Sequence, residues 1–177
     1  VNLELKFDSI RQWRRDNLRS LARAEKNKDE SGYFLRFHSD RKRVDGKVIF
    51  SIDKKTKCSI KARIRAHGDL EDHLSTSLPS LNINLKDGHI YGITKFKLFI
   101  PKTRRFDNEI IAPNLFRELG LLAPRTSKAK VKFYNKNLNF IFQESIVKEF
   151  LENSAVREFP LYAGDERFSF FDFDSQK

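Results

Sequence analysis

The sequence contains no methionine and a single cysteine among its 177 residues. Because Cys58 has no second cysteine to pair with, an internal disulfide framework is excluded. No apolar run is long enough for a transmembrane helix or for the hydrophobic region of a signal peptide. We therefore expect a soluble protein, whose compartment the sequence does not identify. The absence of methionine also leads us to expect a fragment of a longer protein.

Basic residues outnumber acidic ones, with 35 Lys and Arg against 24 Asp and Glu and a formal net charge of +11. Such a surplus predicts attraction to polyanions such as nucleic acid, anionic membrane surfaces or nucleotide phosphates. Hydrophobic residues make up 39% of the chain and include 17 phenylalanines, which is enough for a real core. The composition thus predicts a globular basic domain.

The first segment, residues 1–32, is expected to hold a short edge strand followed by a basic helix. An approximate apolar stripe at helical spacing within residues 7–28 is formed by Ile10, Trp13, Leu18 and Leu21, and arginines cover the rest of that helix. A later strand, residues 58–66, alternates apolar and basic side chains. Candidate contacts to a polyanion on these two elements are Arg11, Arg14, Arg15, Lys61, Arg63 and Arg65.

Alternation of apolar and polar residues predicts several further half-buried strands. The expected strands are residues 33–37, 47–53, 58–66, 81–86, 93–100, 128–134 and 138–142. Asp45-Gly46 is a typical hairpin turn and should precede one of them. Strands that alternate in this way favour antiparallel pairing with one buried face.

Residues 67–73 combine two histidines with three carboxylates, which raises the question of a metal site. The spacing matches no zinc motif, and one short loop rarely supplies a closed ligand set. We therefore predict no metal site in this chain.

The stretch from Tyr91 to Glu144 reads as strand, basic turn, helix, strand, turn and strand. Asp107 is a candidate N-cap for the helix, and Gly120 followed by Pro124 is typical of a helix end. This stretch resembles the CotH kinase family in two features. One is the sequence ELGLLAPRT at the end of the helix, and the other is the sequence QE at the end of the last strand, before a short helix. The resemblance extends over roughly Ile60 to Phe168.

The resemblance implies the smaller lobe of a kinase-like fold, and the order of the expected elements agrees with that lobe. We expect an α+β fold: a mostly antiparallel sheet with one central packed helix and an N-terminal helix. This lobe would span residues 33–168, and residues 169–177 would form an acidic aromatic tail. The resemblance also implies ATP with Mg or Mn as cofactor and a protein Ser/Thr as phosphate acceptor.

In a kinase-like lobe, a strand lysine contacts nucleotide phosphates and a helix glutamate positions that lysine. The resemblance therefore implies six candidate nucleotide-binding residues: Lys86, Lys95, Lys97, Glu109, Gln143 and Glu144. Lys95 and Lys97 fall on the same face of their strand, so the sequence does not choose between them. Arg104 and Arg105, in the turn before the helix, could also reach phosphates.

No part of the sequence matches the catalytic loop that phosphoryl transfer requires, so the catalytic residues are unknown. Three hypotheses follow. The chain is the nucleotide-binding part of a CotH-like kinase, or a non-catalytic basic module that binds an acidic polymer, or a structural lobe that has lost ATP binding.

Overall fold

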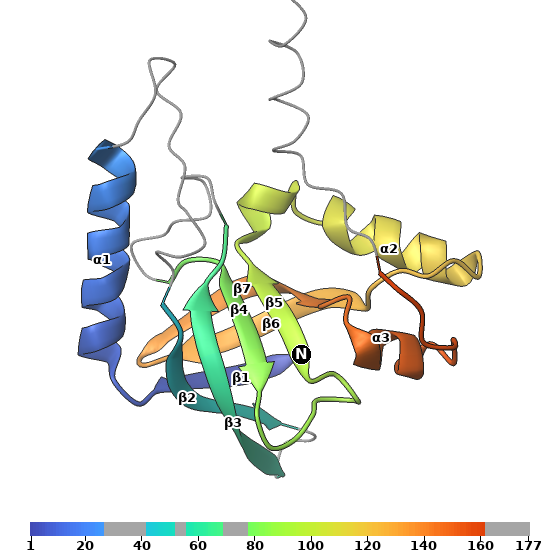
Figure 1. The fold of residues 1–177 in the computed structure, drawn as a ribbon, viewed down its shortest axis with the longest axis horizontal. Coiled ribbons are helices and arrows are strands. Elements are labelled where there is room, and N and C mark those ends of the chain that lie inside the picture. The colour runs from blue at the N-terminus through green and yellow to red at the C-terminus, as the bar shows by residue number, and fades with distance from the viewer. Residues whose placement is uncertain (27–41, 52–55, 69–77, 162–177) are drawn as a thin grey trace, which may run out of the picture.

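The structure is a computed structural model that describes residues 1–26, 42–51, 56–68 and 78–161 (Figure 1). Its elements are β1 (Asn2–Phe7), α1 (Ile10–Lys26), β2 (Val44–Ser51), β3 (Lys57–Ala66), β4 (Leu81–Leu85), β5 (Lys95–Phe99), the 3₁₀ helix η3 (Pro101–Arg104), α2 (Asn108–Glu118), β6 (Thr126–Phe133), β7 (Lys136–Glu144) and α3 (Lys148–Asn153). The predicted strand at residues 33–37, most of the loop at 67–73 and the tail at 169–177 lie outside the described residues.

The strands form a closed barrel in the order β1-β2-β3-β4-β5-β7-β6. Every neighbouring pair is antiparallel except β1 and β6, which run parallel with Leu3 opposite Val131. A ring with an odd number of strands cannot alternate direction throughout, so one parallel contact is unavoidable. The strand expected at a sheet edge is therefore the strand that closes the barrel.

The predicted fold class, an α+β kinase-like lobe with a central packed helix, is wrong. The helix itself forms, but α2 contains no buried residue, and Ile111, Leu115 and Leu119 are 61%, 54% and 66% exposed. It lies outside the barrel against β6 (Figure 1), where the Asn114 side chain donates to the Thr126 carbonyl at 3.2 Å. Since the sheet closes on itself, it needs no helix to cover its apolar face.

The core fills the inside of the barrel. Inward positions alternate with outward ones along each strand, and Phe96 and Phe142 stack inside with ring centroids 4.6 Å apart. Phe7 contacts both Trp13 and Phe133, at 4.9 Å and 5.5 Å between centroids. These rings attach α1 to the barrel through its buried Trp13, which confirms the helix, whereas Leu18 of the predicted apolar stripe is 66% exposed.

No helix among residues 1–26, 42–51, 56–68 and 78–161 combines the length and apolarity needed to cross a membrane.

Asp45 and Gly46 do not form the predicted hairpin turn, because both lie inside β2. Gly46 pairs with Phe7 on one side and Ala62 on the other. A Cβ at Gly46 would clash with the carbonyl oxygen of Lys6 and lie 3.2 Å from the Phe7 Cα. Glycine is needed here because the β1 backbone approaches too closely for any side chain.

We predict that Gly46→Ala lowers the free energy of unfolding by about 1–3 kcal/mol, since the clash is with backbone that cannot rotate away. Urea denaturation followed by circular dichroism measures this loss. Gly88→Ala is the matched control, because its Cβ would contact only the Ile60 side chain, at 3.3 Å or more. An equal loss in both variants would contradict the steric explanation.

Candidate phosphate-binding site

Four polar side chains lie side by side on the outer wall of the barrel, one from each of four strands. Arg65 of β3 is paired with Asn82 of β4, Asn82 with Lys97 of β5, and Lys97 with Gln143 of β7. Directly paired residues project from the same face and lie within reach of each other. The register of the sheet therefore assembles this group, which we call the Lys97 row, from residues far apart in the sequence.

The helix η3 adds a second arginine next to the row. The Arg104 guanidinium lies 4.3 Å from the centre of the Phe99 ring, and the Lys97 ammonium lies 5.9 Å from the same centre. Phe99 is only 1% exposed and faces outward, next to Leu98 of the interior core. Both cations therefore lie against the same buried ring, whose quadrupole attracts positive charge.

The nitrogen Nε of Arg104 is buried and has no hydrogen-bond partner among the described residues. A buried donor without a partner costs free energy unless something else supplies an acceptor. An oxygen acceptor placed near η3 would satisfy this donor.

Glu109, in the first turn of α2, supplies the negative charge of this group. It accepts a hydrogen bond of 2.6 Å from the side-chain amide of Gln143. Its charge also acts on Lys97. The barrel wall and α2 thus bring together three of the predicted site residues, Lys97, Glu109 and Gln143, with Arg65 and Arg104 beside them.

The charges of this group do not balance. Burial lowers the pKa of Lys97, the positive charge of Arg104 lowers it further, Glu109 opposes the shift, and Arg65 again lowers it. A partly desolvated lysine between two arginines and one carboxylate is poorly stabilised in its charged form. An anion at this position would relieve the surplus, and a lysine whose pKa is lowered by burial and by neighbouring cations is a candidate functional group.

We predict that Lys97→Met raises the melting temperature at neutral pH. Below its lowered pKa, Lys97 is charged in both the folded and unfolded protein, and folding must desolvate that charge. Between the lowered pKa and the ordinary value of 10.5 the unfolded chain binds more protons, so stability should rise with pH there, and this rise should be absent in the variant. Differential scanning calorimetry between pH 7 and pH 10.5 measures both effects.

Lys95→Met is the control variant, because it replaces a lysine of the same strand that lies two residues away from Lys97. A lower melting temperature in Lys97→Met than in the parent protein would contradict the account of Lys97 as a destabilised cation.

The other two lysines predicted to contact the nucleotide, Lys95 and Lys86, lie outside the Lys97 row. Lys95 is paired with Asn84 in the next row of the wall, so both strand lysines face outward but only Lys97 adjoins Gln143. Lys86 lies four residues beyond Asn82, about 13 Å along the strand direction. Its ammonium pairs with Asp45 at 2.7 Å, and this hydrogen bond lowers the pKa of Asp45, to which the charges of Lys86 and Arg63 also contribute.

Glu144 lies on the opposite face from Gln143, because consecutive strand residues alternate. It is 3% exposed and accepts two hydrogen bonds of 2.8 Å from the guanidinium of Arg125, which also donates to the Tyr91 carbonyl at 2.7 Å. The hydrogen bonds that Arg125 donates to Glu144 raise the pKa of Arg125. Glu144 therefore anchors the start of β6 and does not border the Lys97 row.

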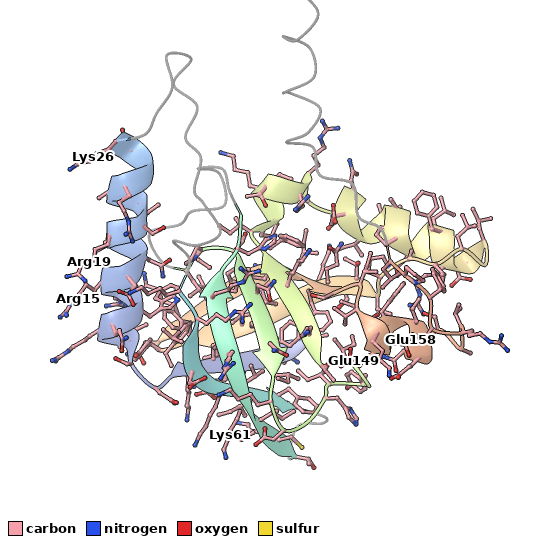
Figure 2. All side chains as sticks on the ribbon, viewed as in Figure 1. Arg15, Arg19, Lys26, Lys61, Glu149 and Glu158 are labelled. Atoms are coloured by element: carbon pink, nitrogen blue, oxygen red, sulfur yellow. The ribbon has the colours of Figure 1, made fainter. Side chains whose placement is uncertain are left out.

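The predicted polyanion contacts are divided among three places. Arg11, Arg14 and Arg15 are exposed on α1, and Figure 2 shows Arg15 and Arg19 pointing away from the barrel. Lys61 and Arg63 are exposed on β3, whereas Arg65 is half-buried and belongs to the Lys97 row.

Sequence reasoning missed Asn82 and Phe99. Asn82 was an unremarkable polar position of an alternating strand. Phe99 follows Leu98 and so breaks the alternation of β5, and that break was the available signal for a buried ring on the outer face.

Within the described parts of the chain, no three His, Cys, Asp or Glu side chains are grouped to hold a metal ion. Glu109 is the carboxylate that α2 places next to the Lys97 row, and it already accepts a hydrogen bond from Gln143. Divalent cations prefer several oxygen ligands, and Mg²⁺ is commonly carried by the phosphates of a nucleotide. The row therefore fits the phosphates and does not fit a metal held by the protein.

A scan against protein-family models found no match, and a search of curated proteins found none either. The resemblance to the CotH kinase family therefore stays a prediction.

Proposed function

We propose that this protein binds the phosphate groups of a nucleotide, ATP in the first instance, at the Lys97 row and Arg104. The observation that carries the proposal is the gathering of positive charge around the partly buried Lys97, opposed among the described residues by the carboxylate of Glu109. Hydrogen bonds between cationic donors and phosphate oxygens are among the stronger ones in proteins. Arg104 offers a planar fork of donors, and Lys97 adds a point charge.

Glu109 and Gln143 act as positioning residues in this proposal. Glu109 is fixed by the 2.6 Å hydrogen bond from Gln143, so its carboxylate remains near Lys97 and limits the repulsion between Lys97 and the arginines. A strand lysine with a helix glutamate is also the arrangement that the family resemblance implies for phosphate contact. Here the two residues come from β5 and α2 of a closed barrel.

The proposed function is ATP binding and does not include phosphoryl transfer. Phosphoryl transfer to a protein Ser/Thr needs a group that accepts the hydroxyl proton and groups that hold the metal ions. The one carboxylate that the described residues place next to the Lys97 row is that of Glu109, which accepts a hydrogen bond from Gln143, so we assign neither role to this site.

We predict that ATP binds to the protein and that Lys97→Met weakens binding by about tenfold or more. A lost hydrogen bond to a charged group costs about 1.5–3 kcal/mol, and each 1.4 kcal/mol corresponds to tenfold in affinity. Isothermal titration calorimetry measures the affinity, with Arg104→Gln as a second test of the same site.

The control variant is Lys95→Met, which removes the same charge two residues away and should change affinity by less than about twofold. Inorganic triphosphate should compete with ATP, and adenosine should not, since the phosphates are recognised. Failure of both ATP and triphosphate to bind would contradict the proposal, as would equal losses in the Lys97 and Lys95 variants.

A second candidate function is non-catalytic binding of an acidic polymer through α1. The observation that favours it is the exposed arginine face of Arg11, Arg14 and Arg15, opposite the buried Trp13. Such a face fits a sequence-independent contact with nucleic acid phosphates.

We predict that replacing Arg11, Arg14 and Arg15 together by Gln makes binding to a 20-base-pair DNA duplex weaker and less salt-dependent. If each arginine neutralises one phosphate, the slope of log K against log salt concentration should fall by about 2.7. Fluorescence anisotropy over a salt series measures the slope. Replacing the exposed residues Lys102, Arg117 and Arg157 is the charge-matched control, and an equal fall in that variant would refute a specific role for α1.

A further inference from the structure

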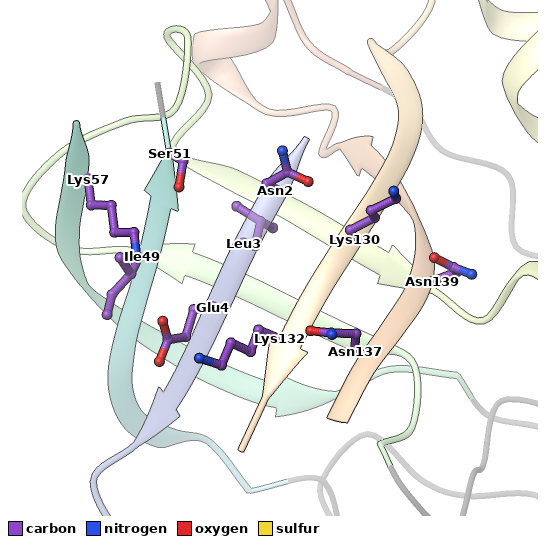
Figure 3. Close-up of a pocket in the computed structure, with 10 residues that line it drawn as sticks. All are labelled: Asn2, Leu3, Glu4, Ile49, Ser51, Lys57, Lys130, Lys132, Asn137 and Asn139. Carbon is purple, nitrogen blue, oxygen red and sulfur yellow. The ribbon is translucent and has the colours of Figure 1, made fainter. Parts of the chain in front are cut away.

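A polar groove crosses the outer wall of the barrel where β1 meets β6, and none of its residues belongs to the Lys97 row. Its volume is about 590 Å³. The groove, which we call the seam groove, is lined by Asn2, Leu3, Glu4, Ile49, Ser51, Lys57, Lys130, Lys132, Asn137 and Asn139 (Figure 3).

The closure of the barrel builds this groove. One row of paired residues runs Ile49, Glu4, Lys132 and Asn137 across β2, β1, β6 and β7. A parallel row joins Asn2 and Lys130 to Asn139. Both rows cross the parallel contact between β1 and β6, so the groove exists only in a closed barrel.

The groove offers three kinds of polar group. Lys57, Lys130 and Lys132 are exposed cations, and Glu4 is the carboxylate between them, 3.8 Å from the ammonium of Lys6. The remaining polar groups are one hydroxyl and three side-chain amides. Each amide has two donors and an acceptor, so the groove has a net positive charge and a dense supply of neutral hydrogen-bonding groups.

This chemistry disfavours two classes of ligand. Single-stranded nucleic acid is held largely by stacking of bases on aromatic rings, and the groove lining contains no aromatic side chain. Peptides commonly add a strand to a free sheet edge, and the closed barrel leaves no such edge among its seven strands. A ligand recognised by side chains alone, through both hydroxyl and acidic groups, is favoured instead.

We propose that the seam groove binds a short acidic oligosaccharide. Its carboxylate or sulfate groups would pair with Lys57, Lys130 and Lys132, and its hydroxyl groups would bond to the asparagine amides. Three strand spacings separate Lys57 on β3 from Lys130 on β6, roughly 14 Å along the sheet. An occupant that pairs with both lysines must therefore be longer than a single sugar. This site is independent of the nucleotide site proposed above.

The test is calorimetric titration of the folded protein with tetragalacturonate, and with its methyl ester, which has the same hydroxyls and no charge. We expect the acid to bind and the ester to bind at least about tenfold more weakly, because the charged hydrogen bonds are lost. The double variant Lys130→Gln, Lys132→Gln should lose affinity for the acid by a similar factor.

The charge-matched control is the double variant Lys47→Gln, Lys61→Gln. These exposed lysines are paired across β2 and β3 and lie outside the groove lining. Their replacement should change affinity by less than about twofold. Circular dichroism of both double variants checks that the barrel is intact.

Three results would overturn the inference. The first is absence of tetragalacturonate binding, and the second is an equal loss of affinity in the groove and control variants, which would indicate diffuse attraction to the whole basic surface. The third is tighter binding of hexaglutamate or of an eight-residue oligothymidine to the same lysines, which would assign the groove to an acidic peptide or to nucleic acid.

Discussion

The parallel contact between β1 and β6 is the constraint on which the rest of the structure depends. It joins the first strand of the chain to one that begins at Thr126, and it converts a curved sheet into a closed barrel. Closure places the apolar side chains of all seven strands on one interior. The sheet therefore needs no covering helix, and α2 lies on the outside with its apolar side chains exposed.

Closure also makes the outer wall the surface on which polar chemistry can be organised. Because all strands are paired, the register places side chains from distant parts of the sequence in continuous rows. One row collects Arg65, Lys97 and Gln143, and α2 and η3 add Glu109 and Arg104 at its end. A second set of rows crosses the β1 and β6 contact itself. Both proposed sites thus follow from strand pairing and not from a loop motif.

The local structure was largely predictable and the architecture was not. Alternation identified strands close to β3, β4, β6 and β7, and helical spacing identified α1 and α2. Glu109 and Gln143 were predicted near a strand lysine, but alternation alone could not separate Lys95 from Lys97, since both face outward. Lys97 is distinguished from Lys95 because Lys97 lies with Arg104 against the Phe99 ring. Closure was missed because pairing between Leu3 and Val131 leaves no local signal, and Gly46 was misassigned because a turn residue and a close backbone contact both favour glycine.

The most direct test of this account is nuclear magnetic resonance of the isotope-labelled protein, through nuclear Overhauser contacts between backbone protons of β1 and β6. In a closed barrel these contacts place Leu3 opposite Val131 and Glu4 opposite Lys132, and the amides of both strands exchange slowly. An open sheet would instead lack these contacts, and the amides of β1 and β6 that face each other would exchange rapidly, as at free edges. That result would contradict the closed barrel and remove the seam groove with it.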